Sequence, residues 1–400
     1  MRRSLTLVIA RSRTFFVLAF GFVLLGMGLT ATGVAWPSVA EAFDRSLAEL
    51  GYVTLLFGGG YTISTLVSGR LSARAGIGRV LLLAAMVAAA ALAALAVSGS
   101  WAVFLIASGS LGFGNGLIDA ATNTYIAIRR GARAMGNIHG AFGVGAIAGP
   151  LLVTALLAAG YSWRLAFAAL AVAEIVYAAG LWRISGHVDV RGAAEAHHPR
   201  GHLLRTSVLA WSLIVFFLYA GIAAGAGVWA FTFLTEERSI AGGPGGIAVA
   251  AYWGGFTASR FVLGFLGDRV HPNTVLRWSA AATAVGFAVF WWNPEPVIGI
   301  AALVFTGFAH GPIFPLQTLL TPRRFGAALT ATVVGFQIAA ANVGGAVLPG
   351  AMGVAVDRTG LAVIPPLLFG NAMVLWGAIE MLRMVSRRQI AAVASGDSAR

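Results

Sequence analysis

The sequence has no cysteine, no lysine and little charge of either sign. Without cysteine the chain can form neither disulfides nor thiolate metal sites, and it offers no cysteine nucleophile. Without lysine it lacks the phosphate-binding lysine of a P-loop, which argues against an ATP-driven machine. Charged residues make up 10% of the 400 residues, whereas a soluble globular domain carries about 25%. These absences exclude an ordinary soluble fold.

Apolar residues take the place of charge. They make up 58% of the chain, and the mean hydropathy is +0.85. A membrane-spanning helix needs roughly 20 apolar residues, and the sequence predicts twelve such segments, six in each half. They lie at 14–36, 47–69, 77–98, 101–126, 135–160 and 162–183, and at 207–234, 245–267, 274–292, 296–320, 326–354 and 361–384. We therefore expect an all-α membrane protein.

The chain also contains a direct repeat. Residues Gly59 to Arg74 return 195 positions later as Gly254 to Arg269 without a gap. Further identities at this offset include Gly112/Gly307, Phe113/Phe308, Gly116/Gly311 and Arg129/Arg324. Many solute carriers are built from two like halves around a central site. We expect two pseudo-symmetric six-helix bundles around a central cavity, at 1–184 and 207–385, with a linker over 185–206 and a tail over 386–400.

All 27 basic residues are arginine, and they are distributed unequally between the loops on the two sides of the predicted membrane. If the N-terminus lies inside, only four fall in outer loops: Arg45, Arg164, Arg238 and Arg358. Cytoplasmic loops of membrane proteins carry an excess of basic residues. We therefore expect a multi-pass protein of the bacterial cytoplasmic (inner) membrane with both termini cytoplasmic. The net charge of +13 then reflects topology, so no nucleic-acid partner is expected.

The linker over 185–206 is the only long polar connection in the sequence, and it contains four histidines: His187, His197, His198 and His202. They could bind a metal, but their spacing is irregular and the segment reads as a solvated linker. We predict no metal site and no cofactor, with a proton gradient as the driving force.

Several motifs resemble those of a known family. Twelve spans, the predicted inner loop Gly69 to Arg79 and its echo Gly264 to Arg269 resemble the major facilitator superfamily. Within that superfamily, Gly114 to Asn123, Asn137 to Pro150 and Gly311 to Pro315 resemble the fucose-permease-type, proton-coupled sugar symporters. In those symporters an acid followed by Ala-Ala-x-Asn is implied to carry the proton, and Asp119 is the matching residue.

Two departures separate the chain from that pattern. Gly33 stands four positions before Pro37, where the family has an aspartate in its first helix. Ala73 replaces the aspartate of the first inner loop, whereas the second half keeps Asp268. The identity of the substrate is therefore not inherited from the resemblance, and the gate at the inner face is expected to be asymmetric.

Asp119 stands out from its surroundings even without the resemblance. An acid in mid-membrane costs about 2.5–3.5 kcal/mol on insertion scales, so it usually faces a cavity and has a partner or a function. Asn115, Asp119 and Asn123 lie at i, i+4 and i+8 and so share one helical stripe. We predict that Asp119 couples transport to protons, with Asn115 and Asn123 binding substrate. The alternative is a neutral or paired aspartate that joins two helices.

Polar residues of other predicted helices extend the candidate substrate site. His310 occupies the repeat position of Asn115, and Gln317 lies two turns further along the same segment. A neutral imidazole could bind a substrate hydroxyl or exchange protons; alternatively, His310 bonds to a neighbouring helix. The remaining candidates are Asn137, His139, Gln337 and Asn342. Tyr61 and Trp229 could stack on a sugar face or belong to the interfacial belts.

Charged residues near the inner ends of the segments are predicted to act as a gate between opposite halves. They are Arg74, Arg129, Asp268, Arg269 and Arg324, with Glu380 and Glu174 as further members. Arg260 is placed with them, but it lies about two turns inside its segment and could instead meet an anionic substrate. For all the arginines the alternative is that they extend to lipid headgroups.

Three functions stay open from sequence alone. The first is uptake of a small polar, sugar-like solute with protons, by a functional monomer in the lipid bilayer. The second is proton-driven efflux of drugs or metabolites, because Gly145-x-x-x-Gly149-Pro150 resembles part of the antiporter motif of drug exporters. The third is a non-transporting membrane protein. The sequence shows no catalytic constellation, so we do not expect an enzyme.

Overall fold

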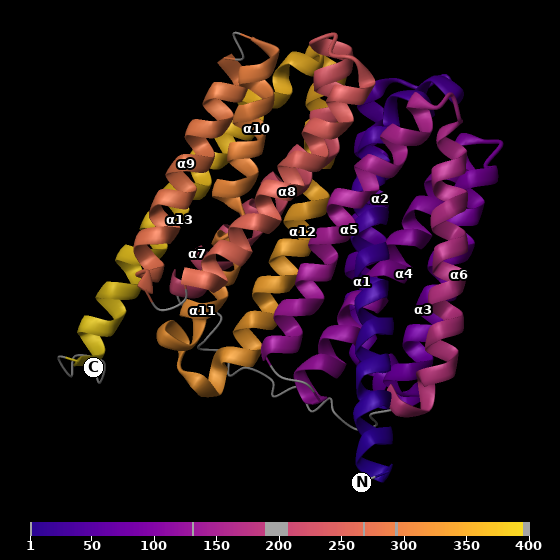
Figure 1. Cartoon of the computed structure of the whole chain (residues 1–400). Helices are drawn as coiled ribbons and strands as arrows, with labels where there is room; N and C mark the ends of the chain where they lie inside the picture. Colours follow the sequence, from indigo (N-terminus) through magenta and orange to yellow (C-terminus); the bar gives the residue numbers. More distant parts are fainter. Residues whose placement is uncertain (1, 130–131, 189–206, 267–268, 293–294, 395–400) are drawn as a thin grey trace. The chain divides into compact units, whose positions relative to one another are not determined.

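The computed structural model describes residues 2–129, 132–188, 207–266, 269–292 and 295–394, and all regular elements there are helical. The chain divides into two compact units (Figure 1). The first unit comprises Met1–Glu195 and Ala230–Ala250, and the second comprises Ala196–Trp229 and Ala251–Arg400. The predicted gate residue Asp268 lies outside the described residues.

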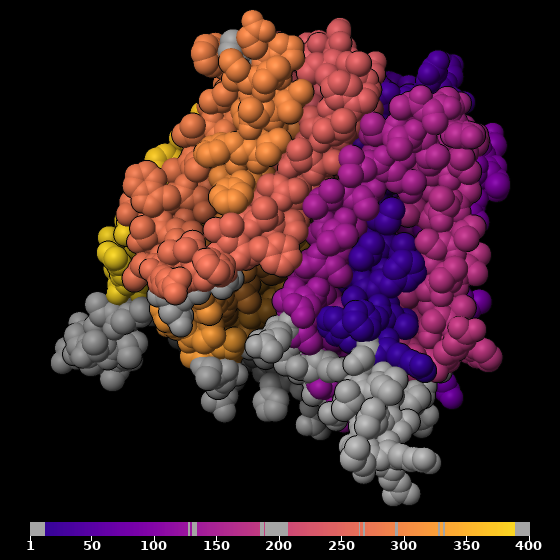
Figure 2. All heavy atoms as spheres, in the orientation of Figure 1, coloured from indigo at the N-terminus to yellow at the C-terminus, as the bar shows by residue number. Residues whose placement is uncertain are grey.

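The first unit contains six long helices, and each pairs with a particular neighbour. They are α1 (Arg2–Ala42), α2 (Leu50–Ala75), α3 (Ile77–Val97), α4 (Trp101–Arg129), α5 (Ala132–Ala158) and α6 (Trp163–Val188), with the short η1 (Leu47–Glu49) before α2. Helix α1 packs on α5, α2 on α4, and α3 on both α4 and α6. Figure 2 shows all heavy atoms of the visible face, where the atoms of helices that follow one another in the first half lie close together.

The second half of the chain repeats this order with one interruption. Its helices are α7 (Ser207–Thr232), η3 (Phe233–Glu237), α8 (Gly242–Leu266), α9 (Pro272–Trp292), α10 (Pro296–His310), α11 (Ile313–Phe325), α12 (Ala327–Thr359), η5 (Leu361–Val363) and α13 (Ile364–Ala394). Helix α9 packs on α10 and α13, as α3 packs on α4 and α6. The segment expected as one helix over 296–320 is broken at Gly311 and Pro312, because Pro312 and Pro315 have no N–H to continue the helical bonding.

The packing of helices on one another follows the repeat. A Cβ atom on Gly112 of α4 would overlap the carbonyl oxygen of Phe57 on α2, and a Cβ atom on Gly307 of α10 would overlap that of Tyr252 on α8. Both pairs are related by the offset of 195. Small residues at such crossings let two backbones approach closely. The same backbone contact therefore joins corresponding helices in each half.

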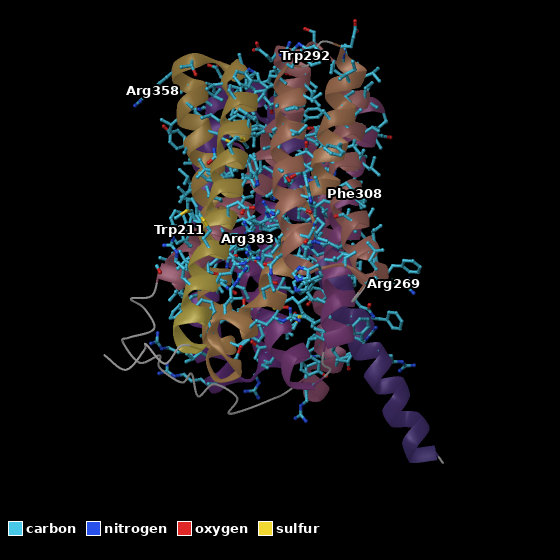
Figure 3. All side chains as sticks on the ribbon, turned by 90° about the vertical axis from the view of Figure 1, so that its left-hand side faces the viewer. Trp211, Arg269, Trp292, Phe308, Arg358 and Arg383 are labelled. Carbon is cyan, nitrogen blue, oxygen red and sulfur yellow. The ribbon has the colours of Figure 1, made fainter. Side chains whose placement is uncertain are left out.

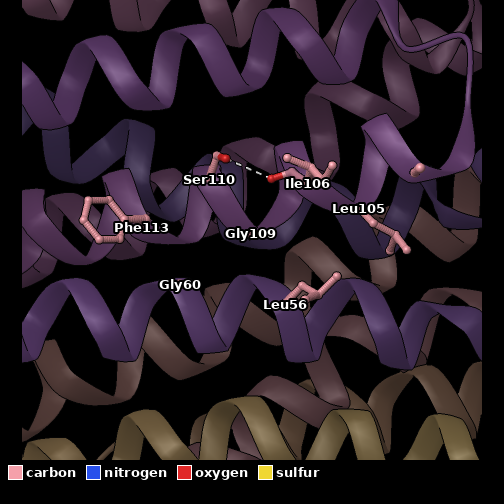
Figure 4. Close-up of a pocket in the computed structure, with 8 residues that line it drawn as sticks. Leu56, Gly60, Leu105, Ile106, Gly109, Ser110 and Phe113 are labelled. Carbon is pink, nitrogen blue, oxygen red and sulfur yellow. Dashed lines mark hydrogen bonds between the residues drawn. The ribbon is translucent and has the colours of Figure 1, made fainter.

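Figure 4 shows a neighbouring part of the α2–α4 crossing, where Gly60 lies opposite Gly109. An open, largely apolar groove runs beside this contact. Its lining comprises Leu56, Gly60, Ala102, Leu105, Ile106, Gly109, Ser110 and Phe113. Ser110 Oγ donates to the Ile106 carbonyl in its own helix at 2.9 Å, so this groove offers a solute few polar partners.

The helices have the length and surface of membrane spans. Eleven stretches in the described part of the chain are long and apolar enough to cross a bilayer. Helix α8 has 25 residues but falls outside these eleven, and it carries Arg260 and a glycine-rich start. Large apolar side chains such as Trp182, Phe265 and Trp278 are 70%, 81% and 72% exposed. In Figure 3, Trp292 and Arg358 lie at one end of the second unit and Arg269 toward the other.

Candidate functional site

A hydrogen-bonded acid lies inside the first unit. Tyr61 on α2 donates its hydroxyl to Oδ2 of Asp119 on α4 at 2.7 Å, and Asn123 Nδ2 donates to Oδ1 at 2.7 Å. Asp119 is half-buried. Within the described residues no basic side chain forms an ion pair with it. Two neutral donors therefore hold both carboxyl oxygens, and the acid can gain or lose a proton without breaking an ion pair. We call Tyr61, Asn115, Asp119 and Asn123 the acid cluster.

The predicted stripe on α4 places Asn115 and Asn123 on either side of the acid. Asn115 is 1% exposed, and its Nδ2 would lie 3.7 Å from a Cβ atom on Gly28 of α1. Asn123 Oδ1 has no hydrogen-bond partner among the described residues. The sequence suggested Tyr61 for ring stacking or for an interfacial belt and did not predict its bond to Asp119. The repeat held a signal, since the mates of Tyr61 and Asp119 are Phe256 and Phe314, so both members change together.

His310 closes α10 in the second unit and is fully buried. Its Nε2 lies 2.9 Å from the backbone carbonyl of Tyr219 on α7, and since a carbonyl only accepts, Nε2 carries the proton. The imidazole stacks on the Tyr219 ring with centroids 4.5 Å apart and planes 8° apart. Its Nδ1 has no partner in the described part of the chain. His310 thus bonds to a neighbouring helix and keeps one free acceptor.

Arg260 on α8 lies against the same tyrosine. Its Nη2 donates to Tyr219 Oη at 2.9 Å, and its Nε donates to the Gly311 carbonyl at 3.2 Å. The guanidinium carbon lies 4.4 Å from the centroid of the Phe256 ring. In a continuous helix the Gly311 carbonyl would accept from the N–H of residue 315, but Pro315 has none. Arg260 therefore stabilises the helix break. We call Tyr219, Phe256, Arg260 and His310 the arginine cluster.

Two glutamines of the second unit are hydrogen-bonded, Gln317 within α11 and Gln337 of α12 to both α11 and α7. Arg324 Nη1 donates to Gln317 Oε1 at 2.6 Å. Gln337 Nε2 donates to Ser212 Oγ on α7 at 2.7 Å, and Thr321 Oγ1 on α11 donates to Gln337 Oε1 at 3.2 Å. Like Asn123 Oδ1 and His310 Nδ1, Gln317 Nε2 and Asn342 Nδ2 have no hydrogen-bond partner among the described residues. A narrow crevice beside Gln317 is lined by Val215, Phe216, Tyr219, Ile313 and Phe314.

The other predicted site residues lie apart from these clusters. Asn137 is exposed near the start of α5, whereas half-buried His139 packs edge-on against Phe22 of α1 with centroids 5.8 Å apart. Trp229 is buried, and its Nε1 donates to the Pro349 carbonyl at 3.0 Å, which leaves no open ring face for a solute. Of the predicted gate arginines, Arg74, Arg129 and Arg269 are exposed and Arg324 is half-buried.

Two acids expected near the gate have different surroundings. Glu380 on α13 pairs with Arg277 of α9 and with Arg383 of its own helix, so its partners lie within its own unit. Glu174 on α6 is 2% exposed, and its Oε2 has no partner in the described residues. Neither acid forms a pair with the predicted gate arginines within the part of the chain that the structure describes.

Comparison with known proteins agrees with the fold. A family model described as Major Facilitator Superfamily matches residues 18–390. The Saccharomyces cerevisiae "Bypass of stop codon protein 6" is 26% identical over 383 residues, which cover 86% of this chain and 77% of the relative. The Bacillus subtilis glucose/mannose transporter GlcP is 21% identical over 380 residues, which cover 90% and 92%.

Solved structures give the same architecture. A mutant of the nucleoside transporter NupG has a TM-score of 0.76 at 15% identity, with 93% of this chain and 99% of that one covered. The human organic anion transporter MFSD10 has a TM-score of 0.69 at 16% identity, with 92% and 99% covered. At these identities the likeness shows the fold alone, which is an all-helical membrane protein of twelve spans.

Proposed function

Since the chain belongs to the Major Facilitator Superfamily and is a secondary transporter, not an enzyme, we propose that it moves a small, polar, sugar-like solute together with protons. Two like halves that alternate in access around a site near the bilayer midplane are the usual architecture of such carriers. The name of the B. subtilis relative, a glucose/mannose transporter, supports the choice of solute class.

The acid cluster carries the proposal of proton coupling. Asp119 lies mid-way along a membrane helix, where an acid is costly and normally functional. Its partners Tyr61 and Asn123 are neutral, so protonation changes the net charge of the cluster by a full unit. A change of that size inside a membrane is strong enough to favour one conformation of the carrier over the other. The amides of Asn115 and Asn123 are suited to bond hydroxyl groups of the solute.

The remaining roles rest on separate observations. His310 and Gln317 each present a buried polar atom that has no partner in the described part of the chain, which supports their assignment to the solute. Both termini are placed in the cytoplasm of a bacterium on the strength of the arginine distribution, and the protein is proposed to work as a monomer. The exposed arginines Arg74, Arg129 and Arg269 are retained as gate residues, together with Arg324.

The substitution Asp119→Asn tests the coupling. An asparagine preserves the shape of the side chain and can keep both hydrogen bonds if Asn123 turns its amide, but it cannot release a proton. In proteoliposomes, accumulation of labelled glucose or mannose driven by a pH gradient should be lost. Exchange of labelled for unlabelled sugar needs no net proton movement and should persist. Glu174→Gln is the matched control, because it neutralises another buried acid of the first unit outside the cluster, and it should keep accumulation.

Accumulation by Asp119→Asn at the parental rate would show that this acid is not the coupling group. Loss of both accumulation and exchange would place Asp119 in solute binding instead, provided that the variant is folded, as an unchanged elution profile in size-exclusion chromatography would show.

Efflux by proton exchange is the alternative function. Gly145 and Gly149 of α5 both lie against the backbone of α1, at Val23 and Met27, and this spacing is the part of the exporter motif that the chain contains. The direction of transport separates the two functions. When the proton gradient is collapsed, cells that take up the solute should lose it, whereas cells that export it should retain more.

A further inference from the structure

The arginine cluster contains a positive charge that the proposed function does not use. We infer that Arg260 binds a carboxylate of the transported solute, so that the solute is a sugar acid or a smaller hydroxylated carboxylate, not a neutral sugar. This inference rests on the proposed function, since it names the substrate class of the same carrier.

The position of Arg260 requires a compensating partner. It stands six residues before the end of α8 at Leu266, or about 9 Å along the helix axis. Arginines at such depth are rare, and they usually pair with a carboxylate or face a water-filled path. The ion pairs formed among the described residues of the second unit join Glu380 to Arg277 and Arg383. Arg260 has hydrogen bonds to neutral oxygens only, so its charge is not neutralised there.

The side chain does not extend toward lipid headgroups. A snorkelling arginine reaches past the nearer end of its helix. The guanidinium of Arg260 instead lies over Phe256, one turn back toward the start of α8. The bond from its Nε to the Gly311 carbonyl and the bond from its Nη2 to Tyr219 Oη hold it there. The protein thus fixes a positive charge toward the middle of the span, with two hydrogen bonds and an aromatic face.

The geometry of the guanidinium leaves one binding edge free. Arginine has five N–H groups in a planar arrangement. The bonds to Gly311 and Tyr219 use the edge formed by Nε and Nη2. The opposite edge, formed by Nη1 and the second hydrogen of Nη2, has no partner in the described residues. Such a fork matches the two coplanar oxygens of a carboxylate. A single arginine would leave a phosphate dianion with one charge uncompensated.

The surroundings suit the rest of a hydroxylated solute. The Tyr219 ring packs against both His310 and Phe256, with centroid distances of 4.5 Å and 6.3 Å, and the His310 and Phe256 rings themselves lie 6.2 Å apart. His310 Nδ1, an acceptor, and Gln317 Nε2, a donor, are buried, and neither has a hydrogen-bond partner among the described residues. Hydroxyl groups can bond to both. Arg260 has Thr65 as its repeat mate, so the charge is special to the second half, as Asp119 is to the first.

Matched pairs of probes test the inference on the purified, full-length transporter. Thermal shifts are measured with glucose and glucuronate, with galactose and galacturonate, and with glucose 6-phosphate and lactate. A uronate differs from its sugar by the C6 carboxylate alone. We expect the uronates to bind more tightly than the neutral sugars. Arg260→Gln should weaken uronate binding about 10- to 100-fold, since charge-assisted hydrogen bonds are lost, while binding of neutral sugars changes little.

Two further variants keep the test valid if Arg260→Gln fails to fold. Arg260→Lys retains the charge but not the fork, and Tyr219→Phe removes the hydroxyl that orients the guanidinium. Both should weaken uronate binding by less than Arg260→Gln. Arg164→Gln is the matched control, because Arg164 also lies over an aromatic ring, Trp163 at 4.2 Å, and donates to a carbonyl, Ser98 at 2.8 Å. It should leave uronate binding unchanged.

The outcomes separate this inference from the proposed function. Equal binding of glucose and glucuronate by the parent would overturn the anion site and leave sugar transport standing. The same holds if uronate binding survives in Arg260→Gln. Preference for glucose 6-phosphate over glucuronate would replace the carboxylate by a phosphate and overturn the inference as stated. No shift with any probe would contradict both proposals. Coupling through Asp119 is judged separately, by accumulation against exchange.

Discussion

Alanine substitution of four glycines tests whether the same backbone contact between helices holds each half of the transporter together. Gly112 on α4 and Gly307 on α10 are repeat mates, and a Cβ atom on either would overlap a carbonyl oxygen of the helix it crosses. Gly59 on α2 and Gly254 on α8 are also repeat mates, and a Cβ atom on either would meet no atom within 4 Å. Alanine at each position therefore gives two crossing variants and two controls in matched surroundings.

The expected free energies of unfolding follow from two effects. Alanine in a helix interior is favoured over glycine by about 1 kcal/mol, and this gain applies to all four variants. Overpacking typically costs about 1–3 kcal/mol. It applies only at the crossings, where backbone atoms of Phe57 and Tyr252 cannot rotate away as a side chain could. The controls should thus be stabilised by up to about 1 kcal/mol, and the crossing variants should lie about 1–3 kcal/mol below them.

Thermal unfolding of the four purified variants in one detergent measures this difference. Gly112→Ala should unfold at a lower temperature than Gly59→Ala, and Gly307→Ala at a lower temperature than Gly254→Ala. The two differences should be similar, because the contacts are equivalent. If the crossing and control variants unfold at the same temperature, the helices are not in backbone contact there. If only one half shows the difference, the two halves do not share this backbone contact, although their sequences repeat.

Two more predictions concern charge. Glu380→Gln should lower the free energy of unfolding only slightly, by under about 1 kcal/mol, because Glu380, Arg277 and Arg383 are 21%, 49% and 22% exposed and partly exposed ion pairs are screened. The difference should shrink further in high salt, and a large loss at all salt concentrations would show that the pair acts as a buried contact. A cysteine introduced at His197 should resist impermeant thiol reagents in intact cells while one at Glu237 reacts, and the reverse pattern would invert the proposed orientation.

Hydropathy predicted the helical fold because it depends only on neighbouring residues, and the repeat can be found by comparing the sequence with itself. A run of apolar residues of sufficient length has few alternatives in a membrane. The break within 296–320 was also indicated by the sequence, through Pro312 and Pro315. The hydropathy of this segment is continuous, however, and predicted a single helix. Helix α8 met the requirements of a membrane span least well, because Arg260 and several glycines lower the apolar character of an otherwise long helix.

Contacts between helices were not predictable in the same way. The stripe of Asn115, Asp119 and Asn123 follows from helical spacing alone, whereas the bond from Tyr61 joins residues 58 positions apart. Similarly, Pro315 guarantees that the Gly311 carbonyl needs another donor, but nothing local identifies Arg260 as that donor. The partners of Glu380 show the same limit, since Arg277 is 103 positions away. Side-chain chemistry could be read from the sequence, and its pairing required the fold.

The repeat distinguishes residues that pack from residues that act. Where α2 crosses α4 and α8 crosses α10, the two halves keep the glycines Gly112 and Gly307, because a side chain there would separate the backbones. In the two clusters the mates differ: Tyr61 and Asp119 correspond to Phe256 and Phe314, and Thr65 corresponds to Arg260. The first half thus holds a negative group and the second a positive one. In the proposed mechanism the acid exchanges the proton while the guanidinium retains the anionic solute. Two identical clusters would place the same groups in both halves, so one half could not exchange the proton while the other binds the solute.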